Sequence, residues 1–252
     1  MNPTDERIPL LLIHGFPHDR TLWQPQVDAL KDVARPISPD LRGFGDSGAP
    51  DSTMTMTGHA DDLKGFLDGM NVRKVVLCGL SMGGYVALAF LNKYPETVEG
   101  LVLCNTRATA DAPEVRRKRQ ALAKRVLAEG MVAVAEELFA PMMAEASKAA
   151  HPDRAEAVLR MMRRQRPEGV AASAQGMAMR PDRTPMLPHV QVPTLIITGD
   201  KDELIPVQES EAMQDAIPGS QLVVIPGAGH LTNVEAPDAF NNALRHFLTT
   251  LR

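Results

Sequence analysis

The stretch from Lys74 to Phe90, KVVLCGLSMGGYVALAF, constrains the fold more than any other part of the sequence. Its first residues are typical of a buried strand, and the Ala- and Leu-rich residues that follow are typical of a helix. Between them lies Ser81 in GLSMG, which fits the pattern G-x-S-x-G. A sharp strand-to-helix turn strains its central serine, and the flanking glycines avoid the resulting clashes. We therefore expect an exposed Ser81 hydroxyl; the alternative is a tight turn with an incidental serine.

Four apolar runs, each followed by turn residues and a helical pattern, are typical of buried parallel strands. They are residues 9–15, 74–79, 100–105 and 193–200, and two weaker candidates are residues 34–40 and 221–227. Strands alternate with helices in both halves of the chain, which indicates an α/β protein with a doubly wound sheet. We expect a mostly parallel sheet of about six strands.

Residues 107–190 differ in character from the rest of the chain. They show no strand pattern, are rich in Ala, Met, Arg and Glu, and carry a formal net charge of +5, against −9 for the remainder. Such a composition favours helices. We therefore expect a core domain of residues 1–106 and 191–252, with residues 107–190 inserted as a helical cap or lid.

Composition and charge argue against several classes of protein. The formal net charge of −4 and the isoelectric point of about 6.0 favour neither nucleic acid nor a membrane surface as a partner. The first apolar run, residues 9–13, is too short for a signal peptide or a membrane span, so we expect a cytoplasmic protein. The two cysteines, Cys78 and Cys104, make a metal site implausible and leave a disulfide between neighbouring strands open. The oligomeric state is also left open.

A serine nucleophile needs a general base, and the base needs an acid that orients it. In proteins with a serine at such a turn, these residues follow in the order Ser, Asp, His. Asp200 and Asp202 follow the predicted strand PTLIITG, and His230 follows the run QLVVIPGAG. Because open α/β sheets gather their ligands at the carboxyl ends of the strands, these side chains are candidates for one site with Ser81.

Five motifs in this order resemble the α/β-hydrolase superfamily, in particular small carboxylesterases and lactonases related to 3-oxoadipate enol-lactonases. The motifs are LLIHGFPHDRTLWQPQ, SPDLRGFGDSGAP, GLSMGGYVAL, VPTLIITGDKDELIP and IPGAGHLTNVEAPDAF. The resemblance implies a serine hydrolase of small carboxylic esters or lactones that needs no cofactor. It makes Ser81 the nucleophile, His230 the base and Asp202 the acid. Asp200 is the rival for the acid and could instead stabilise its loop.

The same resemblance places an oxyanion hole at the backbone N–H groups of Phe16 and Met82. It also implies that His14 fixes the oxyanion loop and that Trp23 packs beneath it. The remaining histidines lack a motif, and we expect them at the surface or in loops: His18, His59, His151, His189 and His246.

Relatives commonly begin with two strands before the strand that precedes the HG turn, and here only about nine residues precede it. We therefore expect a sheet without that hairpin, in which a normally internal strand lies at or near an edge.

The sequence of the predicted cap does not determine the substrate. The basic runs at residues 116–120 and 160–166 are either solvated helix faces or a site that attracts a substrate bearing a carboxylate. The cap methionines either pack its helices against the core or line an adaptable pocket. Alternatives on the same triad are a cofactor-free perhydrolase or haloperoxidase, a carbon–carbon bond hydrolase, and a small-molecule receptor with weak hydrolysis.

Overall fold

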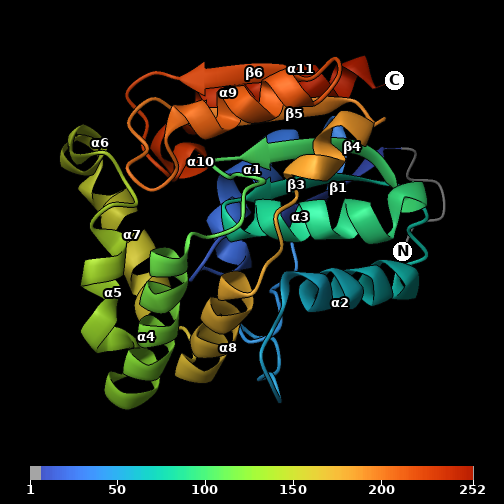
Figure 1. The fold of residues 1–252 in the computed structure, drawn as a ribbon. Coiled ribbons are helices and arrows are strands. Elements are labelled where there is room, and N and C mark those ends of the chain that lie inside the picture. Colours follow the sequence, from blue (N-terminus) through green and yellow to red (C-terminus); the bar gives the residue numbers. More distant parts are fainter. Residues whose placement is uncertain (1–6, 252) are drawn as a thin grey trace.

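The computed structural model describes residues 7–251. At its centre is a six-stranded sheet with the order β2-β1-β3-β4-β5-β6, in which every pairing is parallel (Figure 1). The strands are β1 (Ile8–Ile13), β2 (Ala34–Ile37), β3 (Val75–Leu80), β4 (Val98–Cys104), β5 (Thr194–Gly199) and β6 (Gln221–Ile225). The six predicted strands and the parallel sheet are therefore confirmed.

Both faces of the sheet are buried, because helices cover each of them. One face packs against α2 (Met56–Gly69), α3 (Met82–Lys93) and α9 (Val207–Ala216), and the other against α1 (Gln24–Leu30), α10 (Thr232–Glu235) and α11 (Pro237–Thr250). Successive side chains of a strand point to opposite faces, so Leu11 and Leu77 join the first core while Leu12 and Cys78 join the second. This double burial explains the unbroken apolar runs of the sequence.

Strand β2 forms one edge of the sheet. Within residues 7–251 it pairs only with β1, where Leu10 lies opposite Pro36. Proline has no N–H to donate to a ladder, so it suits an edge strand. The predicted absence of a preceding hairpin concerns residues 1–6, which lie outside the described part of the chain.

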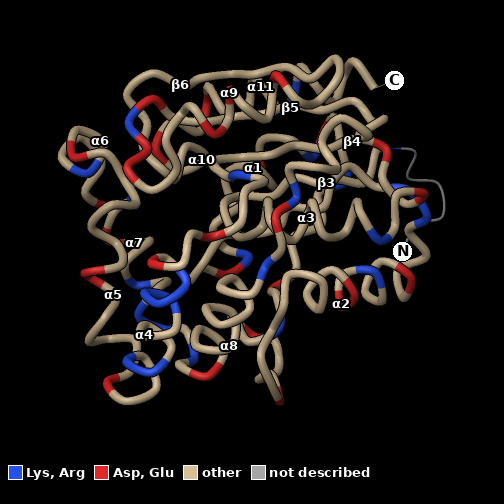
Figure 2. The backbone as a smooth tube through the Cα atoms, viewed as in Figure 1, with Lys and Arg blue, Asp and Glu red and all other residues tan. Residues whose placement is uncertain are grey.

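The segment between β4 and β5 contains five α-helices in the described structure: α4 (Pro113–Glu129), α5 (Met131–Phe139), α6 (Glu145–Ala150), α7 (Pro152–Arg163) and α8 (Pro167–Ala178). They gather beyond the carboxyl ends of the strands (Figure 1), and Lys and Arg are concentrated along α4 (Figure 2). Short 3₁₀ helices connect other parts of the chain at Arg20–Trp23, Pro95–Thr97 and Thr184–His189. The division into core and cap domains stays a prediction.

Close backbone contacts and ion pairs join these helices to the rest of the molecule. A Cβ on Gly176 in α8 would overlap the carbonyl oxygen of Met54, so glycine is needed where the helix crosses that loop. Arg164 pairs with the buried carboxylate of Asp19 at 2.7 Å. One basic run of the sequence thus includes an attachment to the core as well as solvated side chains.

The two cysteines lie on adjacent strands and are free. Their sulfur atoms are 3.8 Å apart, and both side chains are buried. Burial and the neighbouring Cys78 raise the pKa of the Cys104 thiol well above its ordinary value. Among the described helices, none is long and apolar enough to cross a membrane.

Replacing Gly83 by alanine is expected to lower the free energy of unfolding by about 1–3 kcal/mol. The new Cβ would overlap the carbonyl oxygen of Ile13, so α3 or β1 must move. Gly65→Ala is the matched control, because Gly65 lies on the exposed side of α2 and a Cβ there would meet nothing within 4 Å. That variant should gain roughly 0.5–1 kcal/mol from helix propensity. Urea unfolding measures both, and similar stability changes would contradict the proposed packing.

Candidate active site

Ser81 lies at the turn between β3 and α3, with φ 54° and ψ −113°. Such backbone angles are strained for any residue except glycine. Neighbouring glycines permit the turn, because a Cβ on Gly79 would overlap the backbone of Gly83. The Ser81 N–H donates to the carbonyl oxygen of Cys104 at 2.9 Å, and the Thr106 hydroxyl donates to the Ser81 carbonyl oxygen at 2.8 Å. The predicted turn therefore exists and is held on both sides.

His230 contacts Asp202, which follows β5 in the chain. His230 Nδ1 lies 2.8 Å from Asp202 Oδ2, and both side chains are almost wholly buried. The other carboxylate oxygen, Oδ1, accepts the N–H groups of Leu204 and Ile205, both at 2.9 Å. Burial would raise the pKa of Asp202, but the charge and hydrogen bond of His230 and the amide of Asn105 outweigh it and lower that pKa. Asp202 is therefore held as a carboxylate facing the imidazole.

Asp200, the rival acid, has another partner. Its Oδ1 accepts the Gly227 N–H at 2.6 Å, and its Oδ2 lies 3.3 Å from Lys201 Nζ. The first of these contacts lowers the pKa of the Asp200 carboxyl. Asp200 thus ties together the loops after β5 and β6, and it is Asp202 that faces His230.

Sequence reasoning missed Asn105, which follows β4 and supports the acid. Its Nδ2 donates to Asp202 Oδ2 at 2.9 Å and to the Gly229 carbonyl oxygen at 3.1 Å, and its Oδ1 accepts the Thr232 hydroxyl at 2.6 Å. The residue is fully buried at φ 44°, a left-handed conformation that asparagine tolerates. Its place at a strand's carboxyl end, like that of Ser81, was a signal that could have been used.

The loop that carries His230 is fixed by Glu235. The buried carboxylate of Glu235 accepts the N–H groups of Gly229, Leu231 and Ala144 at 2.9, 3.1 and 2.9 Å. The last of these residues precedes α6, so the same carboxylate connects the histidine loop to the inserted helices.

Ser81 and His230 line the same cleft, whose volume is about 700 Å³. Its other walls come from the loop after β1, from β5–α9, and above all from α4 and α5. Apolar side chains such as Phe16, Leu122 and Met142 form most of the lining, together with the cationic side chains Lys118, Arg107, Arg119 and Arg125. The size is ordinary for a small-molecule site.

The two amides expected to form an oxyanion hole, those of Phe16 and Met82, flank this site in sequence. Phe16 lines the cleft, and Met82 begins α3 directly after Ser81. Within residues 7–251 neither N–H has a hydrogen-bond acceptor. A role for the pair as an oxyanion hole stays a prediction.

A sequence model of the alpha/beta hydrolase fold family matches residues 8–237. The chain belongs to this family. The match covers the turn at Ser81 and the loops that contain Asp202 and His230, which lie close together in the structure. The fold class expected from the motifs is thereby confirmed.

Solved and curated alpha/beta hydrolases resemble the chain over nearly its whole length. A thermophilic esterase from Thermogutta terrifontis, solved with malate bound, is 46% identical with a TM-score of 0.95, covering 97% of this chain and 90% of that one. The enol-lactonase from Burkholderia xenovorans LB400 is 29% identical with a TM-score of 0.90, covering 96% and 92%. The 3-oxoadipate enol-lactonase 1 of Acinetobacter baylyi is 28% identical over 93% of this chain and 86% of its own.

Two histidines of this alpha/beta hydrolase are buried, His18 and His59. His18 lies in the loop after β1, in line with the expected surface or loop position, whereas His59 lies on α2, so the expectation was wrong for it. Burial lowers the pKa of each to about 3, so each is neutral at pH 7. Their positions follow from tertiary packing that no local motif marks. The other three, His151, His189 and His246, are exposed as expected.

His14 and Trp23 are both fully buried, and the roles expected of them at the oxyanion loop stay predictions. The Leu41 N–H donates to His14 Nε2 at 3.0 Å, and His14 Nδ1 lies 2.9 Å from the Gly15 carbonyl oxygen, so the neutral ring joins two loops beside the site. Trp23 is fully buried and packs against Phe240 of α11, with ring centroids 5.9 Å apart.

Asp202→Asn should lose stability relative to the wild type near neutral pH, and this difference should shrink in acid. A carboxyl whose pKa is lowered by folding stabilises the protein above its unfolded pKa of about 3.8, and the contribution disappears as pH falls through the lower folded value. Urea unfolding between roughly pH 6 and pH 3 measures the difference. Asp215→Asn, at an exposed site with no ion pair in residues 7–251, is the control. A pH-independent difference for Asp202→Asn would contradict the assignment.

Proposed function

We propose that this protein is a serine hydrolase that cleaves small carboxylic esters or lactones through an acyl-enzyme on Ser81. The observation that carries the proposal is the 2.8 Å contact of His230 with the buried Asp202, in a cleft that Ser81 also lines. A strained serine, a buried acid–imidazole pair and a mostly apolar cleft together suit acyl transfer.

In the proposed mechanism the Ser81 hydroxyl attacks the carbonyl carbon while His230 accepts its proton. Asp202 fixes the orientation of the imidazole and stabilises the imidazolium that forms. The amides of Phe16 and Met82 hold the oxyanion, and the positive end of α3 adds to this stabilisation. His230 then protonates the leaving alcohol, and water repeats the sequence to release the acid. Protein groups and water supply every step.

We propose a substrate that carries a carboxylate in addition to the ester or lactone. Four cationic side chains line the cleft, and Glu137 is the acidic side chain among its lining residues. Lys118 and Arg125 pair with glutamates of α4 and α5, whereas Arg107 and Arg119 share the one carboxylate of Asp111, at 2.9 and 2.6 Å. Two guanidinium groups beside the cleft therefore share one negative charge. Guanidinium groups bind carboxylates with a matching planar geometry.

The relatives support this substrate class. The enol-lactonases resemble the chain at 28–29% identity, and the structure of the more similar Thermogutta esterase contains malate, a dicarboxylate. Small esters or lactones with an acidic group fit both the named reactions and the charge of the cleft.

We also propose that residues 107–190 act as a cap on a core of residues 1–106 and 191–252. Helices α4 and α5 supply a large part of the cleft wall, including Val115, Leu122 and Leu138. Substrate size would then be set by the cap and chemistry by the core. A cytoplasmic location and the lack of nucleic-acid or membrane partners stay predictions.

Ser81→Ala should lower kcat for a short-chain p-nitrophenyl ester by at least about 10⁴-fold, because no other group can form the acyl-enzyme. An ester series from acetate to decanoate measures this, and its optimum reports the size of the cleft. His230→Ala should cost about as much, and the double variant little more, since the two residues act as a unit. Activity that persists in Ser81→Ala would sink the proposal. Wild-type protein without turnover on any ester or lactone would favour a receptor.

Arg119→Gln should raise KM for a hemisuccinate ester about tenfold, which corresponds to the loss of one charge-assisted hydrogen bond. The same variant should change KM for a neutral ester of similar length by less than about twofold, because that ester has no carboxylate to lose a contact. Arg117→Gln is the control, because Arg117 is exposed, lies on the same helix and does not line the cleft. Equal effects of Arg119→Gln on both esters would refute the carboxylate preference.

A further inference from the structure

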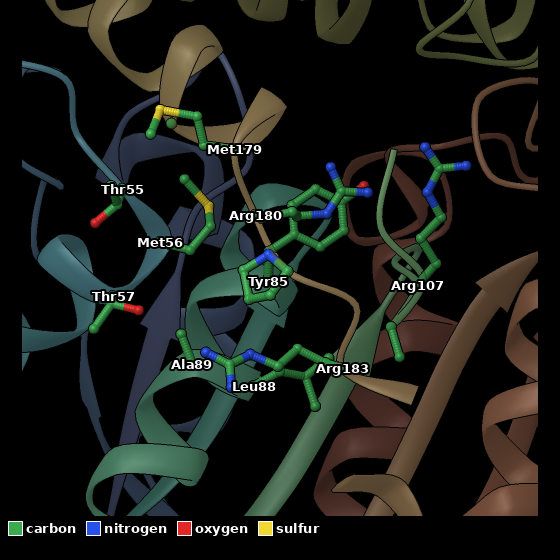
Figure 3. A pocket seen from close by; sticks show the side chains of 13 residues that line it. Thr55, Met56, Thr57, Tyr85, Leu88, Ala89, Arg107, Met179, Arg180 and Arg183 are labelled. Carbon is green, nitrogen blue, oxygen red and sulfur yellow. The ribbon is translucent and has the colours of Figure 1, made fainter. Parts of the chain in front are cut away.

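A second, smaller cavity of about 190 Å³ lies between the start of α2, the middle of α3 and the chain after α8 (Figure 3). We call it the rear cavity. Its lining includes Met56, Leu88, Ala89 and Met179, together with Arg107, Arg180 and Arg183. Ser81 and His230 are not among its lining residues, so it is separate from the proposed catalytic cleft.

Tyr85 and Arg107 line both spaces and form part of the wall between them. Arg180 is packed onto this wall, with its guanidinium carbon 3.9 Å from the centroid of the Tyr85 ring. An occupant of the rear cavity would therefore touch two side chains that the substrate cleft also uses.

Positive charge exceeds negative charge around the rear cavity. The carboxylate of Asp111 is fully buried and is shared by three arginines, with contacts of 2.9 Å to Arg107, 2.6 Å to Arg119 and 2.8 Å to Arg180. One carboxylate neutralises one guanidinium, and the negative charge of Glu209 also acts on Arg107, so about one positive charge remains uncompensated within this cluster. Uncompensated buried charge is costly unless a further anion offsets it.

Two arginines still have hydrogen-bonding groups to offer. Arg180 is only 5% exposed, and its Nε has no partner in the described structure. Arg183 is half-buried, and within residues 7–251 its side chain has neither an ion pair nor a hydrogen bond. Figure 3 shows the Arg183 side chain extending along the cavity toward Ala89. Met56 and Thr57, the first residues of the 14-residue helix α2, also line the space and add the positive end of its dipole.

The size and the remaining lining restrict the ligand. The volume corresponds to about six water molecules, because each occupies roughly 30 Å³ in the liquid. Leu88, Ala89 and the two methionines supply apolar surface, which suits a short hydrocarbon chain better than an inorganic ion. An anion of four or so carbon atoms would satisfy both the charge and the apolar wall.

We propose that the rear cavity is a second binding site, specific for small organic carboxylates. Arg183 is the principal carboxylate ligand in this site, and the unpartnered Nε of Arg180 is a further hydrogen-bond donor. The proposal does not depend on the proposed catalytic function, because binding can be measured on protein that lacks the serine.

The test is isothermal titration calorimetry with succinate on the full chain carrying Ser81→Ala and Lys118→Gln, which removes turnover and a cationic side chain that lines the cleft but not the rear cavity. Arg183→Gln, added to this reference protein, should weaken succinate binding at least tenfold. Arg183→Lys keeps the charge without the planar fork and should give an intermediate affinity. Arg73→Gln is the matched control, since Arg73 is exposed and does not line either space, and it should leave the affinity unchanged.

Neutral succinamide, which has the same length, should not bind measurably. Because Arg183 has no ion pair to lose in the described structure, its variants should keep the fold, and thermal unfolding checks this. Three results would overturn the proposal: no binding of succinate to the reference protein, equal affinity in Arg183→Gln, or equal binding of succinamide.

Discussion

Close packing of the backbone at the end of β3 is the constraint on which the site depends. A side chain on Gly79 or Gly83 would overlap neighbouring backbone, so the chain can turn from strand to helix only where both positions lack a Cβ. The turn forces Ser81 to φ 54°, a conformation that surrounding hydrogen bonds maintain. Because the sheet is parallel, this turn shares an edge with the loops after β4, β5 and β6, which contribute Asn105, Asp202 and His230.

The second requirement is that a buried carboxylate remain ionised beside an imidazole. Burial disfavours the charged form of Asp202, and the structure offsets this with two backbone N–H groups, the Asn105 amide and His230 itself. Asn105 also bonds the Gly229 carbonyl oxygen, which directly precedes the histidine. Acid and base are therefore positioned by one network, in which Glu235 fixes the far side of the histidine loop. Such complete satisfaction restricts the imidazole to one orientation.

The fold and the proposed triad could be predicted from the sequence, because both depend on patterns formed by residues close together in the chain. Apolar runs with turn residues predicted all six strands, and the resemblance to α/β-hydrolases favoured Asp202 over Asp200, whose carboxylate holds a loop. Features created by distant segments could not be predicted. The burial of His59, whose ring contacts the Ser173 hydroxyl of α8, arises only when that helix packs against α2. The convergence of Arg107, Arg119 and Arg180 on Asp111 arises only when distant parts of residues 107–190 pack together.

The central claim is that Ser81 forms a covalent acyl-enzyme, and rapid-quench mass spectrometry of the intact protein tests it most directly. After mixing with excess p-nitrophenyl ester and quenching in acid within milliseconds, the protein should gain the mass of one acyl group. Peptide mapping should place that group on the peptide that contains GLSMGG, at Ser81. Turnover without an acyl adduct at any quenching time, or an acyl adduct on a different residue, would contradict the account.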